Sequence, residues 1–118
     1  MPRLLRTLAA AALSLTATPG LAQPVNGVFD SDCTAIQAGA FTDGRVELRP
    51  GRIMFHESSC TLTNPVAVRD MNGAMLYVGV CSGEGETWTR RLMIMPGFAN
   101  GVVVAWPGWA RTLSLCAP

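Results

Sequence analysis

Residues 71–95 read MNGAMLYVGVCSGEGETWTRRLMIM, and this stretch decides the fold. Two runs rich in β-branched, aromatic and long apolar residues, 74–81 and 86–95, flank the turn-forming segment 82–85. Asn72-Gly73 precedes the first run, and Asn-Gly is a strong hairpin signal because both residues tolerate positive φ angles. The stretch therefore predicts successive antiparallel strands rather than helices.

The same pattern of short β-prone runs and turn residues continues on both sides of this stretch. Turns are expected at Pro50-Gly51, between residues 96 and 101, and at Pro107-Gly108. One short helical turn is expected over residues 32–38. The predicted strands are Arg45–Arg49, Arg52–Glu57, Cys60–Asn64, Val66–Met71, Ala74–Cys81, Glu86–Met95, Val102–Trp106 and Trp109–Leu115. The predicted fold class is all-β, a small antiparallel meander closed as a barrel or a sandwich.

Turn lengths predict which residues face one another on neighbouring strands. Two-residue loops place Leu48 opposite Ile53, Val68 opposite Tyr77 and Trp106 opposite Trp109. A four-residue loop at 82–85 places Gly79 opposite Trp88. These hairpins share one inner face, expected to contain Val46, Leu48, Ile53, Phe55, Leu62, Val66, Val68, Tyr77, Trp88, Leu92, Val104, Trp106, Trp109 and Leu113.

Two features disturb this simple pattern. Arg90 and Arg111 fall on the inner face, where a guanidinium needs partners. A small error of register or a β-bulge is the preferred interpretation, and a real polar feature is the alternative. The outer face is unusually apolar, and either the N-terminal segment covers it, which is preferred, or it joins two copies in a homo-oligomer. Its apolar residues are Leu76, Val78, Val80, Met93 and Val103.

Four cysteines allow three disulfide connectivities, and strand direction discriminates among them. In the predicted meander Cys81 and Cys116 lie at opposite ends of their strands, too far apart to bond. Cys60 starts its strand at the end where Cys81 finishes. The prediction is therefore Cys60–Cys81, which leaves Cys33–Cys116. Free thiols and a zinc site are weaker alternatives, because no Cys-x-x-Cys pair exists and the single histidine has no suitable spacing.

Residues 1–22 have the three parts of a cleavable secretory signal peptide. Arg3 and Arg6 are followed by a run of leucine and alanine, and Gly20-Leu21-Ala22 supplies small residues for cleavage. The apolar run is about half of the ~20 residues that a membrane span needs. We expect one disulfide-bonded β domain over 23–118, exported to the periplasm or the extracellular space, with no membrane span after cleavage.

The charge of the domain excludes some classes of partner. Without Arg3 and Arg6, seven basic residues, all arginine, stand against eight acidic ones, so the net charge is about −1. No basic patch is available for nucleic acid, and no polybasic stretch is available for a membrane surface.

Signals for catalysis are weak. His56 is the only histidine, and no nucleophile-elbow motif surrounds Ser58 or Ser59. Gly83-x-Gly85 lacks the helix that a phosphate-binding loop needs, so no nucleotide or other cofactor is expected. The prediction is a protein that is not an enzyme, with no catalytic residues and no metal site.

The sequence favours binding over catalysis. Tryptophans and charged residues collect at the end of the meander near the predicted Cys60–Cys81 bond, although they also suit hairpin packing and a solvated loop tip. The leading hypothesis is a non-catalytic, exported binding or interaction module for an unknown small ligand or protein. The alternative is an inhibitor of a periplasmic or secreted hydrolase, which inserts the 82–85 loop into an active site. The candidate binding residues are Trp88, Trp106, Trp109, Glu57, Glu84, Glu86 and Arg90.

Overall fold

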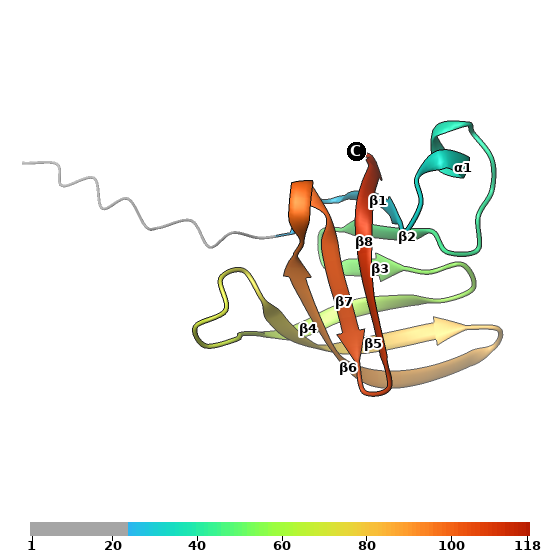
Figure 1. The fold of residues 1–118 in the computed structure, drawn as a ribbon. Coiled ribbons are helices and arrows are strands. Elements are labelled where there is room, and N and C mark those ends of the chain that lie inside the picture. The colour runs from blue at the N-terminus through green and yellow to red at the C-terminus, as the bar shows by residue number, and fades with distance from the viewer. Residues whose placement is uncertain (1–23) are drawn as a thin grey trace, which may run out of the picture.

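Each strand of the structure pairs with the strands before and after it in the sequence, and the first strand also pairs with the last, so the sheet closes into a barrel (Figure 1). The structure is a computed structural model that describes residues 24–118, and the predicted signal peptide, residues 1–22, lies outside them. The strands are β1 (Gly27–Asp30), β2 (Val46–Arg49), β3 (Arg52–Met54), β4 (Ser59–Ala67), β5 (Met75–Gly83), β6 (Glu86–Pro96), β7 (Val102–Trp106) and β8 (Trp109–Ala117). Two short helices, α1 (Thr34–Gln37) and η1 (Phe98–Asn100), lie in the connections. The all-β prediction is confirmed, and a barrel is formed rather than a sandwich.

Two of the three hairpins predicted with two-residue loops have the predicted register. Leu48 pairs with Ile53 across the Pro50-Gly51 turn, and Trp106 pairs with Trp109 across the Pro107-Gly108 turn. In each turn the glycine has a positive φ, 70° for Gly51 and 87° for Gly108, which glycine adopts without strain. These local signals were sufficient because two residues complete each connection.

The predicted register of β5 and β6 is wrong by two residues. Cys81, not Gly79, lies opposite Trp88, because the connecting turn consists of Glu84 and Gly85 alone. Both turn residues have positive φ, 50° and 79°, as the tightest β-hairpin turn requires. A shift of two residues keeps every side chain on its predicted face, whereas a shift of one would have reversed the faces.

The predicted hairpin at Asn72-Gly73 is also wrong. β4 runs continuously through the boundary that was expected between two strands, and it pairs Val66 with Leu76. A register shift lies between Thr63 and Val66, and Asn64 within it has a φ of 50°. This irregularity turns Val66 out of the core, and its side chain is 54% exposed.

The barrel interior holds the hydrophobic core. Every predicted inner-face residue except Val66 and Val68 belongs to this core or packs against it. The largest omission is Phe29, which is fully buried on β1 between β2 and β8. Residues 27–30 were assigned no strand, because one four-residue stretch carries little periodicity of its own.

Both predicted disulfides are present. Cys60 and Cys81 face one another on β4 and β5, with their Cα atoms 4.0 Å apart. Cys33, just before α1, is bonded to Cys116 near the end of β8, with a Cα–Cα distance of 5.1 Å. All four cysteines are thereby occupied, so the free-thiol and zinc alternatives are wrong. Two intramolecular disulfides are consistent with an oxidising, exported environment.

The outer apolar face is not covered as predicted. Residues 27–30 form β1 between β2 and β8 instead of crossing the outside of β5 and β6. Val80 remains 51% exposed there. Further along β5, a shallow apolar hollow of about 370 Å³ lies between Leu76, Met93 and Pro107. Among residues 24–118, no helix has the length and apolar character needed to cross a membrane.

Candidate functional site

One end of the barrel carries a hollow of about 330 Å³, which we call the barrel mouth. The β3–β4 turn, β6, the β7–β8 hairpin and the loop that follows α1 surround it. Four of the seven predicted binding residues line it, namely Glu57, Arg90, Trp106 and Trp109. The complete lining is Asp43, Phe55, His56, Glu57, Ser58, Arg90, Trp106, Trp109 and Arg111.

Three aromatic rings form the apolar wall of the mouth. Trp106 and Trp109 stack with their centroids 3.8 Å apart and their planes 13° from parallel. Phe55 meets both indoles edge-on, at 5.6 Å from Trp106 and 6.3 Å from Trp109. Such edge-to-face and offset contacts stabilise aromatic clusters beyond the area they bury. The rings hold one another in place, so the wall is largely preformed.

Arg90 extends the stack on the side of β6. Its guanidinium carbon lies 4.2 Å from the centroid of the Trp106 ring, a cation–π distance. β7, which carries Trp106, lies between β6 and β8 in the sheet. Arg90 and Trp109 both lie within 4.2 Å of the Trp106 ring centroid, so they cannot occupy the same face of that ring. The guanidinium, Trp106 and Trp109 are therefore layered in that order.

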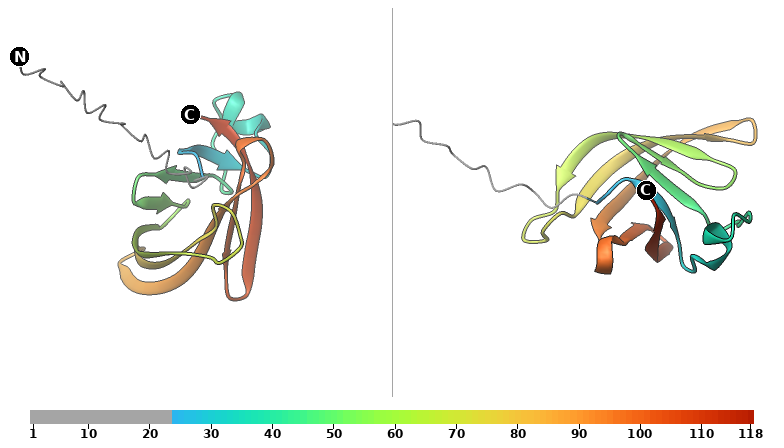
Figure 2. Two further views of the ribbon diagram at one scale, coloured as in Figure 1. Left: turned by 90° about the vertical axis from the view of Figure 1, so that its left-hand side faces the viewer. Right: turned by 90° about the horizontal axis from the view of Figure 1, so that it is seen from above.

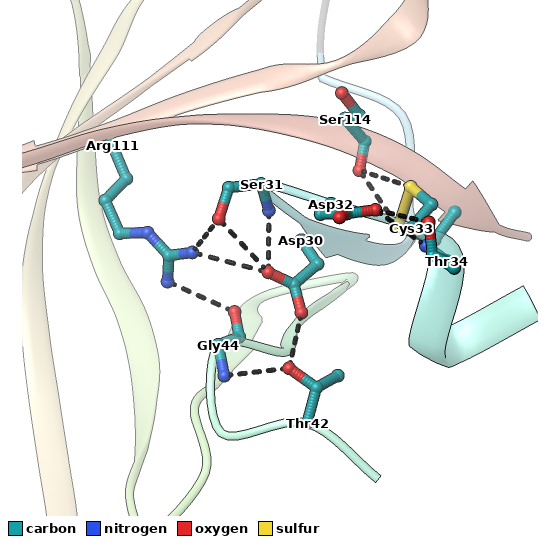
Figure 3. Close-up of polar contacts among 10 residues, drawn as sticks. Asp30, Ser31, Asp32, Cys33, Thr34, Thr42, Gly44, Arg111 and Ser114 are labelled. Carbon is teal, nitrogen blue, oxygen red and sulfur yellow. Dashed lines mark hydrogen bonds and ion pairs between the residues drawn. A yellow bond between two sulfur atoms is a disulfide. The ribbon is translucent and has the colours of Figure 1, made fainter. Parts of the chain in front are cut away.

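Arg111 also points inward, and here the structure provides partners (Figure 3). Its guanidinium donates to the Gly44 carbonyl at 3.1 Å, to Ser31 Oγ at 2.7 Å and to Asp30 Oδ1 at 3.4 Å. The inward position of Arg90 and Arg111 is thus a real polar feature, and the interpretation as an error of register is wrong. Each guanidinium is accommodated differently, one by an aromatic face and one by acceptors.

Asp30 is the centre of the network around Arg111, and only 5% of it is exposed. Burial by itself raises the pKa of Asp30, but hydrogen bonds from Thr42 and Ser31, together with the charge of Arg111, outweigh burial and hold the pKa below its ordinary value. Thr42 Oγ1 donates to Asp30 Oδ2 at 2.8 Å and accepts from the Gly44 N–H at 3.2 Å. The network therefore ties the loop after α1 to β1 and β8.

Gly44 fits this network because it has no side chain. A Cβ at this position would lie 2.7 Å from Asp30 Oδ1 and 3.2 Å from Arg111 Nη2. The glycine lets the loop approach the ion pair closely and places the neighbouring Asp43 at the edge of the mouth.

The rim of the mouth is polar and more exposed. His56 Nε2 lies 3.7 Å from Asp43 Oδ1 and 3.5 Å from Glu57 Oε1. Phe41 packs against the imidazole at 4.9 Å between centroids. Glu84, at the tip of the β5–β6 hairpin, lies beside Glu57, and hydrogen bonding to that carboxyl together with charge repulsion raises the pKa of Glu84.

Three predicted binding residues lie outside the lining of the mouth. Trp88 packs against the core opposite Cys81, and its Nε1 is buried without a hydrogen-bond partner among the described residues. Glu84 and Glu86 lie at the exposed hairpin tip. Conversely, the mouth includes Asp43 and Arg111, which were not predicted as binding residues. Only the closure of the barrel and the path of the 39–45 loop bring them there.

No hydrogen bond joins Ser58 to His56 in the described part of the chain, and the His56 Nε2 atom faces carboxylates instead. Within residues 24–118, no group of three or more His, Cys, Asp or Glu side chains is arranged to hold a metal ion. The mouth consists of an aromatic wall, the Arg90 guanidinium packed on that wall, and acidic side chains at the rim.

Comparison with protein-family models, curated proteins and solved structures finds no match for this chain.

Proposed function

We propose that this protein is an exported, non-catalytic binding module that holds a small ligand in the barrel mouth. The observation that carries this proposal is the layered arrangement of Arg90, Trp106 and Trp109 along one side of a 330 Å³ hollow. Small-molecule sites are concave, mostly apolar and supplied with a few placed polar groups. The hollow is near the lower end of their usual range of about 300–1,000 Å³.

The rigidity of the mouth supports the proposal. Cys60–Cys81 joins the two strands behind the β3–β4 turn, and the Asp30–Arg111 network fixes the loop on the other side. A site whose walls are already ordered loses less conformational entropy when a ligand enters. A small domain therefore gains affinity from fixing these walls before binding.

Export is part of the proposal. The secretory signal expected over residues 1–22 and the two disulfides both suit an oxidising compartment, either the periplasm or the extracellular space. The protein would serve there as a carrier, sensor or receptor module and not as an enzyme, because among residues 24–118 no nucleophile is hydrogen-bonded to the one histidine.

Intrinsic tryptophan fluorescence tests the proposal. A panel of metabolites and glycans should contain compounds that shift the emission saturably in the wild type. The shift should be lost in Trp109→Ala and retained in Phe98→Ala, since Phe98 is 94% exposed on η1. Silence of the wild type across a broad panel would count against a small-ligand mouth.

A second candidate, an inhibitor of an exported hydrolase, is favoured by the β5–β6 hairpin. Figure 2 shows this hairpin extending past the β3–β4 turn at one end of the molecule. Cys60–Cys81 joins the hairpin to β4 close to its tip. A Cβ at Gly83 would collide with the Glu57 carbonyl and with Ser58, so this end of the hairpin packs tightly on the β3–β4 turn. Rigid, projecting loops of this kind can block an active-site cleft.

Affinity capture from a periplasmic extract tests the second candidate. The wild type should retain a hydrolase and reduce its activity, whereas a Glu84→Ala, Glu86→Ala double variant should release it. Capture that depends on Trp109 instead of the tip would assign binding to the mouth.

A further inference from the structure

We propose that the ligand is a small carboxylate with a flat apolar body, and that Arg90 binds its carboxylate group. This inference rests on the proposed function of the barrel mouth and goes beyond it by naming the chemical class of the ligand. It follows from a difference between two arginines that share the inner face of the barrel.

The Arg111 guanidinium finds its hydrogen-bond acceptors within the protein. It contacts the Asp30 carboxylate on β1, the Ser31 hydroxyl just after β1 and the Gly44 carbonyl in the loop after α1. Arg90 lies two strands away with its guanidinium at the mouth, and its one partner among residues 24–118 is the face of Trp106. Within residues 24–118, no acid forms an ion pair with it and no acceptor takes its N–H groups.

The acids nearest the mouth do not fill this role. Asp43 and Glu57 both contact His56 at the rim, as described above. The half-buried guanidinium of Arg90 has lost part of its hydration. Its N–H donors without an acceptor therefore cost free energy until an anion binds them. A site for an external anion requires a cation that no acid of the protein already neutralises, and Arg90 meets this condition.

The geometry of the stack selects a carboxylate. Contact with the Trp106 ring limits where the Arg90 guanidinium can lie, and its N–H groups form a rigid planar fork. A carboxylate accepts two parallel hydrogen bonds from such a fork. The stack therefore limits the positions of the donors before the ligand binds.

The aromatic wall selects the rest of the ligand. Trp109 and Phe55 line the same hollow as the Arg90 guanidinium and offer apolar surface there. A cavity of about 150 Å³ is enough to hold benzene. The 330 Å³ mouth thus fits a body of about one or two rings, which leaves the carboxylate at Arg90.

Benzoate and benzamide test this assignment, because they share a ring and differ in charge. Their binding to the whole protein is followed by nuclear magnetic resonance of the three indole N–H signals, which permits detection of millimolar affinity. We expect benzoate to bind at least about tenfold more tightly than benzamide, as one charge-assisted hydrogen-bond pair implies. The shifted signals should be those of Trp106 and Trp109, with Trp88 less affected.

Three variants locate the preference. Arg90→Gln should abolish the benzoate preference, and Arg90→Lys should leave it reduced, because an ammonium keeps the charge without the planar fork. Arg91→Gln is the matched control, since the next side chain on β6 is exposed and points to the opposite face. It should behave as the wild type. Raising the salt concentration should weaken benzoate binding more than benzamide binding.

The results that overturn the inference differ from those that overturn the proposed function. The inference is overturned if benzoate and benzamide bind equally, or if Arg90→Gln keeps the preference for benzoate. Either result shows that the mouth binds ligands but that Arg90 does not recognise their charge. Failure of both probes to shift any indole signal also overturns the carboxylate assignment, while saturable binding of neutral compounds in the fluorescence panel leaves the mouth itself supported. Folding of each variant is verified from its dispersed amide spectrum before either conclusion is drawn.

Discussion

Trp106 and Trp109 stack directly across the β7–β8 hairpin, with their ring centroids 3.8 Å apart. The contact joins local structure to the candidate site, because the residues that close the Pro107-Gly108 turn also form the wall of the barrel mouth. Replacing either indole should therefore change both the stability of the hairpin and the shape of the site.

Trp109→Ala should lower the free energy of unfolding by about 2–3 kcal/mol, less than a fully buried tryptophan would lose, because its ring is only half-buried. Urea denaturation measures the loss, and the near-ultraviolet circular dichroism of the stacked indoles should collapse with it. Phe98→Ala removes an aromatic ring that is 94% exposed and should change neither measurement. Unaltered dichroism in Trp109→Ala would show that the stack does not persist in solution.

The Asp30–Arg111 network should contribute to stability and to the order of the 39–45 loop. Asp30→Ala leaves the half-buried Arg111 without its carboxylate and removes the acceptor for Thr42, so we expect a loss of about 2–4 kcal/mol. Hydrogen exchange at Gly44 should accelerate, because its N–H is bonded within this network. Asp70→Asn is the control, since among residues 24–118 Asp70 pairs only with Arg69, both side chains are at least 90% exposed, and asparagine tolerates the φ of 58° at this position. A loss in Asp30→Ala no larger than in that control would contradict the role of the network.

Acid should destabilise the protein through Asp30. Its pKa in the folded protein lies below the ordinary value of 3.8, so the unfolded chain takes up the proton more readily than the folded one. The stabilisation is complete above the unfolded value and disappears as the pH falls through the folded one. Glu47, whose pKa a hydrogen bond from Arg49 lowers, contributes in the same direction. Unfolding measured between pH 6 and pH 2 should show a smaller acid-induced loss in Asp30→Asn than in the wild type, and parallel profiles would refute the assignment.

The Glu57–Glu84 contact should act in the opposite direction. Hydrogen bonding and repulsion between the two carboxyls raise the pKa of Glu84, so ionisation at neutral pH disfavours their present arrangement. Glu84→Gln keeps the size of the side chain and removes the repulsion. We expect a small rise in melting temperature at pH 7 that vanishes near pH 3. Glu86→Gln, at the same exposed tip, serves as the comparison, and an equal rise in it would indicate a general charge effect.

The two disulfides should be reduced in a fixed order. Cys60 and Cys81 are 2% and 1% exposed, whereas Cys33 and Cys116 are only half-buried. Limited reduction followed by alkylation and mass spectrometry should therefore label Cys33 and Cys116 first. Opening this bond, which spans 83 residues, should cost roughly 4–5 kcal/mol by the chain-entropy relation. Earlier labelling of Cys60 and Cys81 would mean that β4 and β5 separate more easily than their burial implies.

Much of the barrel was predictable because its signals are local. Leu48 and Ile53 are paired by two intervening residues, and alternation along β6 assigns Leu92 to the core whichever of the two registers the hairpin adopts. Strand direction then determined that Cys60 and Cys81 lie at the same end. The error at Asn72-Gly73 arose because the bulge near Asn64 depends on how β4 crosses the barrel, which no local pattern records.

The candidate site was only partly predictable. Glu57, Arg90, Trp106 and Trp109 could be grouped because the predicted strands bring their ends together. Asp43 could not, since it lies in a loop whose position depends on the Asp30–Arg111 ion pair, between residues 81 positions apart. The different partners of Arg90 and Arg111 could not be predicted either, because in the sequence both are arginines on an otherwise apolar face.

The sequence by itself determined most of the strands, most of their inner-face residues and the pairing of the cysteines, because turn residues and alternation act over a few positions of the chain. Only the tertiary structure decided that β1 closes the barrel against β8, that Arg111 is neutralised from within, and that Arg90 keeps its donors at the mouth. The physical reason is that each of these depends on contacts between distant residues. Such contacts form only once the barrel has closed, and the closed barrel determines which polar groups find a partner.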